Sequence, residues 1–240
     1  MNRTLSFLLL FAFLLTTHVS AQIAEQETYL SSIKEELTKK WPENRTINLV
    51  YHGHSVPSGY YTGGVVRRFD SYPFMVMKQL KEKYPYAVIN TITTSIGGEQ
   101  SEQGAKRFAS DVLSLQPDII FIDYALNDRS IGLKRAKTAW ERMVDLAGEK
   151  GVKVILLTPT PDTQVDILES DNILEQHAGQ IRRLAKNYRI GLVDSFKAFQ
   201  DVVASGKELN SYMAQNNHPN ALGHALVAGE IMKWFEQCKQ

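Results

Sequence analysis

The sequence has 240 residues, of which 43% are hydrophobic and 22% charged, as in an ordinary globular protein. This length suits one compact domain with a sizeable core. The formal net charge of +1 excludes a strongly basic surface of the kind that binds nucleic acid, so we expect no nucleic-acid partner.

The N-terminal segment differs in character from the rest of the chain. A short basic start with Arg3 is followed by an apolar run over residues 5–15 and by small residues that end at Ala21. This pattern is typical of a secretory signal peptide, which we assign to residues 1–21, and an uncleaved membrane anchor is the alternative. We therefore expect residues 22–240 to form a single domain that is secreted or periplasmic, with no membrane contact after signal cleavage.

Five short segments are apolar and rich in β-branched residues, which predicts strands covered on both faces. They are residues 46–52, 86–94, 119–124, 152–158 and 190–193. Helices are predicted between and around them, at residues 24–40, 72–84, 101–114, 133–150, 171–188, 196–205 and 221–238. Residues 56–70 and 207–217 are predicted loops. Strands that alternate with helices indicate a parallel five-stranded sheet in a three-layer α/β/α sandwich.

Four polar or glycine positions in loops are candidates for a site. Ser55 follows the first predicted strand, Gly98 the second and Asn127 the third, while His218 precedes the last helix. Right-handed crossovers bring the carboxyl ends of parallel strands to one edge of the sheet, so we expect these residues to converge there.

The types of these residues suit nucleophilic catalysis on an ester. A serine is inert until a base takes its proton, and His218 has the near-neutral pKa that this needs. The N–H groups of Ser55 and Gly98 and the side-chain amide of Asn127 suit an oxyanion hole. Each of these residue types, taken alone, more often lies in a turn or caps a helix. Their joint occurrence at one edge favours the catalytic interpretation.

The sequence around these positions resembles the SGNH (GDSL-like) hydrolase superfamily, and in particular its carbohydrate esterases. The four matching segments are Gly53-His54-Ser55, Ser95-Ile96-Gly97-Gly98, Ala125-Leu126-Asn127-Asp128 and His218-Pro219-Asn220. The resemblance implies a flavodoxin-like fold and a serine ester hydrolase without a cofactor. It implies that Ser55 is the nucleophile, His218 the base, and Ser55, Gly98 and Asn127 the oxyanion donors.

The chain departs from the family pattern in two places. His54 stands where the family usually has Asp before the nucleophile, and Gln215 stands where it usually has Asp three residues before the histidine. We therefore predict a Ser55–His218 dyad whose histidine is oriented by a neutral group, either the Gln215 side chain or a nearby main-chain carbonyl. A rival is an acid from elsewhere, such as Asp194, although this residue more simply caps the following helix.

Some polar residues near the predicted edge are candidate substrate contacts, and each is equally acceptable as a surface or packing residue. They are His54, Tyr60, Arg68 and Arg129. The histidines lack the spacing of a metal site, and the glycine pairs lack a nucleotide-binding pattern, so we expect neither a metal nor a cofactor.

Together these observations predict an exported serine esterase that removes a small acyl group, acetyl in particular, from a carbohydrate or a similar polar substrate. A lysophospholipase or a thioesterase of the same superfamily is one alternative. A non-catalytic binding protein on this fold is another, because Gln215 removes the usual acid. The sequence leaves the natural ester and the oligomeric state open.

Overall fold

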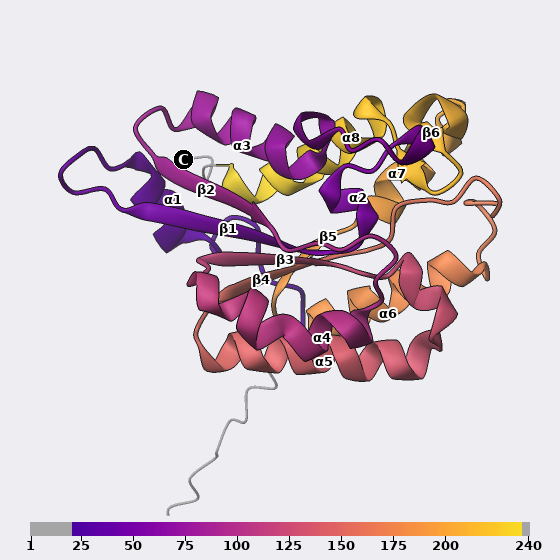
Figure 1. The fold of residues 1–240 in the computed structure, drawn as a ribbon, viewed down its shortest axis with the longest axis horizontal. Helices are drawn as coiled ribbons and strands as arrows, with labels where there is room; N and C mark the ends of the chain where they lie inside the picture. The colour runs from indigo at the N-terminus through magenta and orange to yellow at the C-terminus, as the bar shows by residue number, and fades with distance from the viewer. Residues whose placement is uncertain (1–20, 237–240) are drawn as a thin grey trace, which may run out of the picture.

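The computed structural model describes residues 21–236, and Figure 1 shows their fold. The predicted signal peptide lies outside the described residues, apart from its last position, Ala21. Within the described part of the chain, none of the helices is both long and apolar enough to cross a membrane.

The centre of the molecule is a sheet of five parallel strands, which confirms the predicted sheet. The strands are β1 (Thr46–Gly53), β2 (Val88–Thr93), β3 (Ile119–Asp123), β4 (Lys153–Leu157) and β5 (Gly191–Val193). Their order is β2-β1-β3-β4-β5, so β1 and β3 lie side by side in the interior of the sheet. Because all strands run the same way, their carboxyl ends share one edge.

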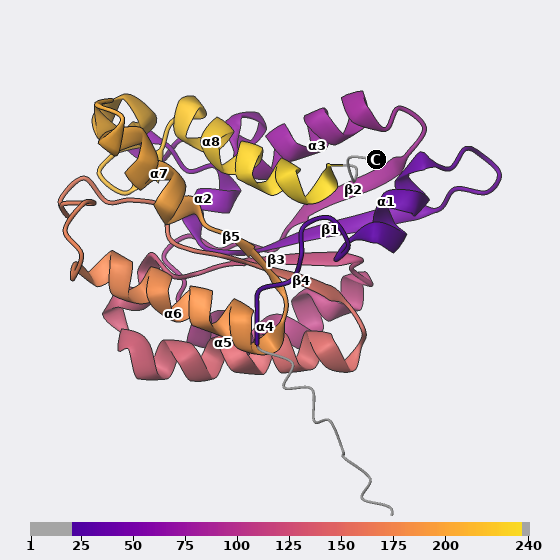
Figure 2. The ribbon, with the colours of Figure 1, turned by 180° about the vertical axis from the view of Figure 1, so that it is seen from behind.

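Helices cover both faces of this sheet and make the predicted three layers. They are α1 (Ser31–Thr38), α2 (Ser55–Ser58), α3 (Tyr72–Lys83), α4 (Ser101–Asp111), α5 (Gly132–Glu149), α6 (Ile173–Tyr188), α7 (Ser195–Ala204) and α8 (Ala221–Met232). Figures 1 and 2 show α3, α7 and α8 on one face, with α4, α5 and α6 on the other.

The strand sequences explain the two cores on either side of the sheet. Successive side chains of a strand point to opposite faces, so a strand buried on both sides must be apolar throughout. In β3, Ile119 and Phe121 pack in the core shared with α3 and α8, whereas Ile120 and Ile122 pack in the core shared with α4 and α5. The continuous apolar runs noted in the sequence are thus the signature of a covered parallel sheet.

Three segments differ from their predicted structure, and the first is the predicted loop 56–70, which begins within the helical turn α2. The helix predicted for residues 24–40 is reduced to α1, because turns occupy the residues before it and Leu30 offers no side-chain cap. The predicted loop 207–217 contains β6 (Met213–Gln215), which pairs antiparallel with β7 (His218–Pro219). A ladder this short leaves no periodic signal in a sequence.

Candidate active site

The nucleophile candidate, Ser55, stands at the carboxyl end of β1, one of the interior strands of the sheet. It is the first residue of the single helical turn α2 and is largely buried, with 8% of its surface exposed. Gly53, the last residue of β1, is tightly packed, because a Cβ there would lie 2.4 Å from the backbone oxygen of Asp123. Only glycine therefore fits where β1 passes the end of β3 and turns toward Ser55.

The β6–β7 hairpin brings His218 to this serine across 163 residues of sequence. His218 Nε2 lies 2.7 Å from Ser55 Oγ, a hydrogen-bond distance. The hairpin is fixed by the Asn220 N–H, which donates to the Tyr212 carbonyl oxygen at 2.9 Å, and by the Thr62 hydroxyl, which donates to the Ala214 carbonyl oxygen at 2.6 Å. The second contact ties the loop after α2 to the hairpin.

The other ring nitrogen of His218, Nδ1, decides which tautomer is present. It lies 2.8 Å from Asn217 Oδ1 and 2.6 Å from Gln215 Nε2. A nitrogen that donates its hydrogen to Asn217 cannot also accept one from Gln215, so the two contacts require opposite tautomers. Only the Nδ1–H tautomer leaves Nε2 with the lone pair that can take the Ser55 proton. In that tautomer Asn217 Oδ1 accepts the Nδ1 hydrogen. The Gln215 side-chain amide is then flipped, so that its oxygen and not its nitrogen faces Nδ1.

Asn217 is a residue that the sequence interpretation missed. Its position next to His218 and its amide oxygen were the available signals, but the usual family spacing directs attention to Gln215. Asp194, the rival acid, is engaged elsewhere: its carboxylate accepts from Arg182 Nε at 2.6 Å and caps α7 through the Lys197 N–H at 3.2 Å. The described partners of His218 Nδ1 are therefore neutral amides.

Burial lowers the pKa of His218 to about 4. Removal from water penalises the charged imidazolium, and no carboxylate accepts from Nδ1 to offset this cost within residues 21–236. His218 is therefore neutral at mildly acidic and neutral pH. That is the protonation state in which it can accept a proton from Ser55.

The two remaining oxyanion candidates lie together beside a small hollow. A cavity of about 270 Å³ is lined by Gly98, Gln100, Leu126, Asn127, Arg129 and Ser130. Gly98 has a φ of +77°, which disfavours any residue with a side chain, and its N–H donates to no acceptor within residues 21–236. The Asn127 side-chain amide donates one hydrogen to the Glu99 carbonyl oxygen at 3.0 Å, which leaves its second hydrogen available.

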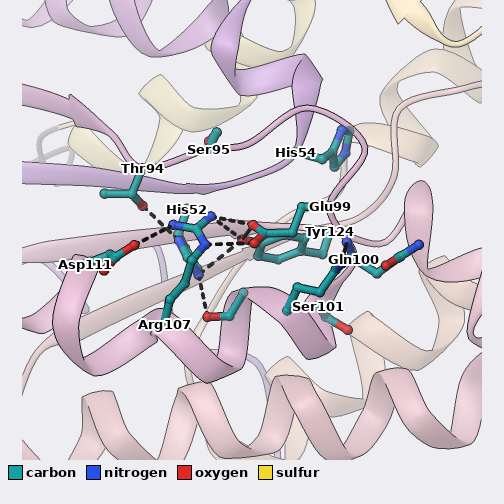
Figure 3. A network of polar contacts seen from close by, with 12 residues as sticks. His52, His54, Thr94, Ser95, Glu99, Gln100, Ser101, Arg107, Asp111 and Tyr124 are labelled. Atoms are coloured by element: carbon teal, nitrogen blue, oxygen red, sulfur yellow. Dashed lines mark hydrogen bonds and ion pairs between the residues drawn. The ribbon is translucent and has the colours of Figure 1, made fainter.

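A buried polar network lies behind this pair, and Figure 3 shows it. Glu99, next to Gly98, accepts from the Tyr124 hydroxyl at 2.7 Å and from Arg107 through both Nε, at 2.8 Å, and Nη2. His52 continues the network, with Nδ1 2.8 Å from Thr94 Oγ1. Because Glu99 also receives the Asn127 amide on its carbonyl, the network holds the Gly98 turn and Asn127 in one place. No pattern in the sequence indicates this network.

Burial lowers the pKa of His52 to about 4, so this ring is neutral. Its contacts are hydrogen bonds to protein groups. Among the described residues, no group of three or more His, Cys, Asp or Glu side chains is arranged to hold a metal ion.

The four candidate substrate contacts have different surroundings. His54 is fully buried, so a substrate has no access to its ring. Tyr60 packs on Gly97, and its ring centre lies 6.5 Å from that of His218. Arg129 lines the hollow and pairs with Asp162 at 3.0 Å.

Arg68, the fourth candidate, contacts the carboxyl end of the edge strand β2. It donates to the Thr93 hydroxyl, and its guanidinium lies 5.2 Å from the centre of the Phe74 ring. Of the three candidates that are not buried, Tyr60 lies next to His218 and Arg129 lines the hollow.

Comparisons with solved structures identify proteins of the same fold. A two-domain esterase (CEX) active on acetylated mannans superposes with a TM-score of 0.71 at 24% identity, over 89% of this chain and 54% of that one. The chain thus spans about half the length of that protein. A catalytic mutant of Axe2, an acetylxylan esterase from Geobacillus stearothermophilus, gives a TM-score of 0.68 at 18% identity, over 80% of this chain and 94% of that one.

A search of curated proteins finds no match. The family comparison does: the model of the GDSL-like lipase/acylhydrolase family matches residues 52–226, which include all four of the sequence segments described above. This match confirms the resemblance inferred from the four sequence segments. The chain belongs to the GDSL-like lipase/acylhydrolase family, whose members are carboxylic ester hydrolases.

Proposed function

We propose that this protein is an exported serine esterase that removes acetyl groups from a carbohydrate. The observation that carries the proposal is the 2.7 Å contact between Ser55 Oγ and His218 Nε2 at the carboxyl edge of the sheet. A neutral histidine at this distance from a largely buried serine hydroxyl is the arrangement that activates a serine nucleophile.

The reaction follows from the positions of these groups. Ser55 Oγ attacks the ester carbonyl while its proton passes to His218 Nε2. The oxyanion is stabilised by the N–H groups of Ser55 and Gly98 and by the Asn127 amide. His218 then gives its proton to the departing sugar hydroxyl, which leaves an acetyl group on Ser55. A water molecule, deprotonated by His218, releases acetate and restores the serine.

The substrate proposal is supported by the neighbours and by the dimensions of the site. The two neighbours named above act on acetylated mannans and on acetylxylan, according to their descriptions. In this chain the hollow beside Gly98 and Asn127 measures about 270 Å³, and the Tyr60 ring packs on Gly97 close to His218. These features suit a short acyl group better than a fatty acyl chain.

The decisive experiment measures acetate release from acetylated mannan and acetylxylan, with the Ser55→Ala protein as the blank. A series of p-nitrophenyl esters of increasing acyl length follows on the same preparations. We expect acetyl to be the fastest substrate. A preference for long acyl chains would favour a lysophospholipase or a thioesterase instead.

Labelling of the folded protein by a fluorophosphonate tests catalysis itself. We expect rapid labelling at Ser55, which Ser55→Ala abolishes. An unreactive Ser55 would favour a non-catalytic binding protein on this fold. Export is tested by locating the processed chain after expression with its own N-terminus, which we expect to begin at Gln22.

A further inference from the structure

A histidine and an aspartate that the mechanism does not use lie buried beneath the nucleophile. His54 and Asp123 have 0% and 2% of their surfaces exposed, and His54 Nε2 lies 3.5 Å from Asp123 Oδ1. Within the described residues, neither atom has a hydrogen-bond partner. In Figure 3, His54 lies apart from the network around Glu99, with no contact drawn to it.

The contacts of the His54 ring fix its tautomer. The Val56 N–H donates to His54 Nδ1 at 3.3 Å, so Nδ1 carries a lone pair and the hydrogen of the neutral ring is on Nε2. Nε2 lies 3.5 Å from Asp123 Oδ1, an electrostatic contact without hydrogen-bond geometry. The other carboxylate oxygen of Asp123 accepts from the Tyr72 hydroxyl at 2.9 Å. A buried carboxylate is costly unless such donors surround it, so Asp123 favours the tautomer with the hydrogen on Nε2.

The lone pair on His54 Nδ1 acts at the nucleophile itself. Val56 follows Ser55 in α2, and His54 is the cap of that turn. Ser55 Oγ lies 3.5 Å from His54 Nδ1 on one side and 2.7 Å from His218 Nε2 on the other. A hydrogen bond that fixes the Val56 N–H therefore also fixes the direction of the Ser55 side chain.

We propose that Asp123 and His54 are a positioning pair for the nucleophile. Asp123 holds His54 in the Nε2–H tautomer, and His54 through Nδ1 holds the turn that points Ser55 Oγ at His218. The inference rests on the proposed function, because it assigns a role in the same reaction. A displacement of about 1 Å at a reacting atom can cost about a hundredfold in rate, so the support of this turn affects catalysis.

Two apolar substitutions separate positioning from packing. His54→Phe keeps a ring but removes the group that faces Asp123 Oδ1. Asp123→Leu removes the group that faces His54 Nε2 and also the acceptor of the Tyr72 hydroxyl. Each single variant should lose both stability and kcat. In the double variant the buried pair becomes apolar, and such replacements typically restore stability. We expect the double variant to regain most of its thermal stability while its kcat stays about a hundredfold below that of the wild type.

Measurements of kcat, KM and the rate of fluorophosphonate labelling complete the test. We expect KM to change by less than about threefold, because uniform binding is unaffected, while kcat and labelling fall together. His54→Asn, whose side-chain oxygen can accept from the Val56 N–H, should retain kcat within about tenfold of the wild type. Tyr72→Phe is the matched control, which removes a contact of Asp123 without touching His54.

Two results would overturn the inference. One is a double variant that recovers kcat together with stability, since the pair would then only fill space. The other is a His54→Asn protein as slow as His54→Phe. Failure of the proposed function has a different signature, because the wild type would then release no acetate or Ser55→Ala would remain active.

Discussion

Replacement of Gln215 by Glu tests how His218 is held. The two side chains have nearly the same shape, so the new carboxylate takes the position of an atom now 2.6 Å from His218 Nδ1. Opposite charges 4 Å apart gain about 4 kcal/mol near a protein surface, and exposure of residue 215 reduces this to about 1 kcal/mol. This gain stabilises the imidazolium, so the pKa of His218 should rise from about 4 to about 5.

The assay is the pH dependence of kcat/KM, which reports groups of the free enzyme. The base must be neutral, so activity falls as the pH drops through the pKa of His218. In the wild type we expect this fall near pH 4, and in Gln215→Glu about one pH unit higher. The same stabilisation should raise kcat at neutral pH by up to about tenfold. Gln215→Met is the matched control without charge. An unchanged profile and an unchanged kcat in Gln215→Glu would refute the assignment of this side chain to Nδ1.

Three further predictions follow from the described contacts. Asn217→Ala removes the acceptor of the Nδ1 hydrogen, so kcat should fall about tenfold at constant KM; unchanged kcat would exclude Asn217 as the orienting group. Glu99→Gln breaks the buried ion pair with Arg107, so the free energy of unfolding, measured by thermal unfolding, should fall by about 3 kcal/mol. We expect kcat to fall as well. A loss of stability without a loss of kcat would show that the network does not support the oxyanion site. Burial also lowers the pKa of His177 to about 4 and of His224 to about 3. Between pH 6.5 and pH 5 each of these histidines should therefore lower the free energy of unfolding, measured in urea, by about 2 kcal/mol. Equal free energies of unfolding at the two pH values would contradict this prediction.

The fold could be predicted because its signals are local and repeated. The apolar run in β1 and the alternation of strands with helices specify a covered parallel sheet, and the structure has one. The β6–β7 hairpin could not be predicted in this way. Its few residues form a ladder through contacts with the loop after α2, such as that between Thr62 and Ala214, and these depend on the assembled fold.

The residues of the candidate site also fall into two groups, those that can be predicted from the sequence and those that cannot. Ser55, Gly98, Asn127 and His218 could be proposed from the sequence because each lies in a segment whose position relative to a strand or helix can be read directly. The residues that support them could not be found, since their meaning depends on a partner far away in sequence. Asp123, for example, is only one residue of the predicted strand 119–124 until the structure places it 3.5 Å from His54.

The lower pH limit of this enzyme should be set by the fold and not by the base. His218 stays neutral down to about pH 4. The buried histidines His52, His177 and His224 are also neutral in the folded chain, but in the unfolded chain they take up protons below about pH 6.5. As the pH is lowered, the free energy of unfolding therefore begins to fall at a pH more than two units above the pH at which His218 becomes protonated. Initial rates taken within seconds of a jump to pH 5 should remain high, whereas rates after long incubation at pH 5 should decline. Equal decline in both assays would place the limit at His218 itself.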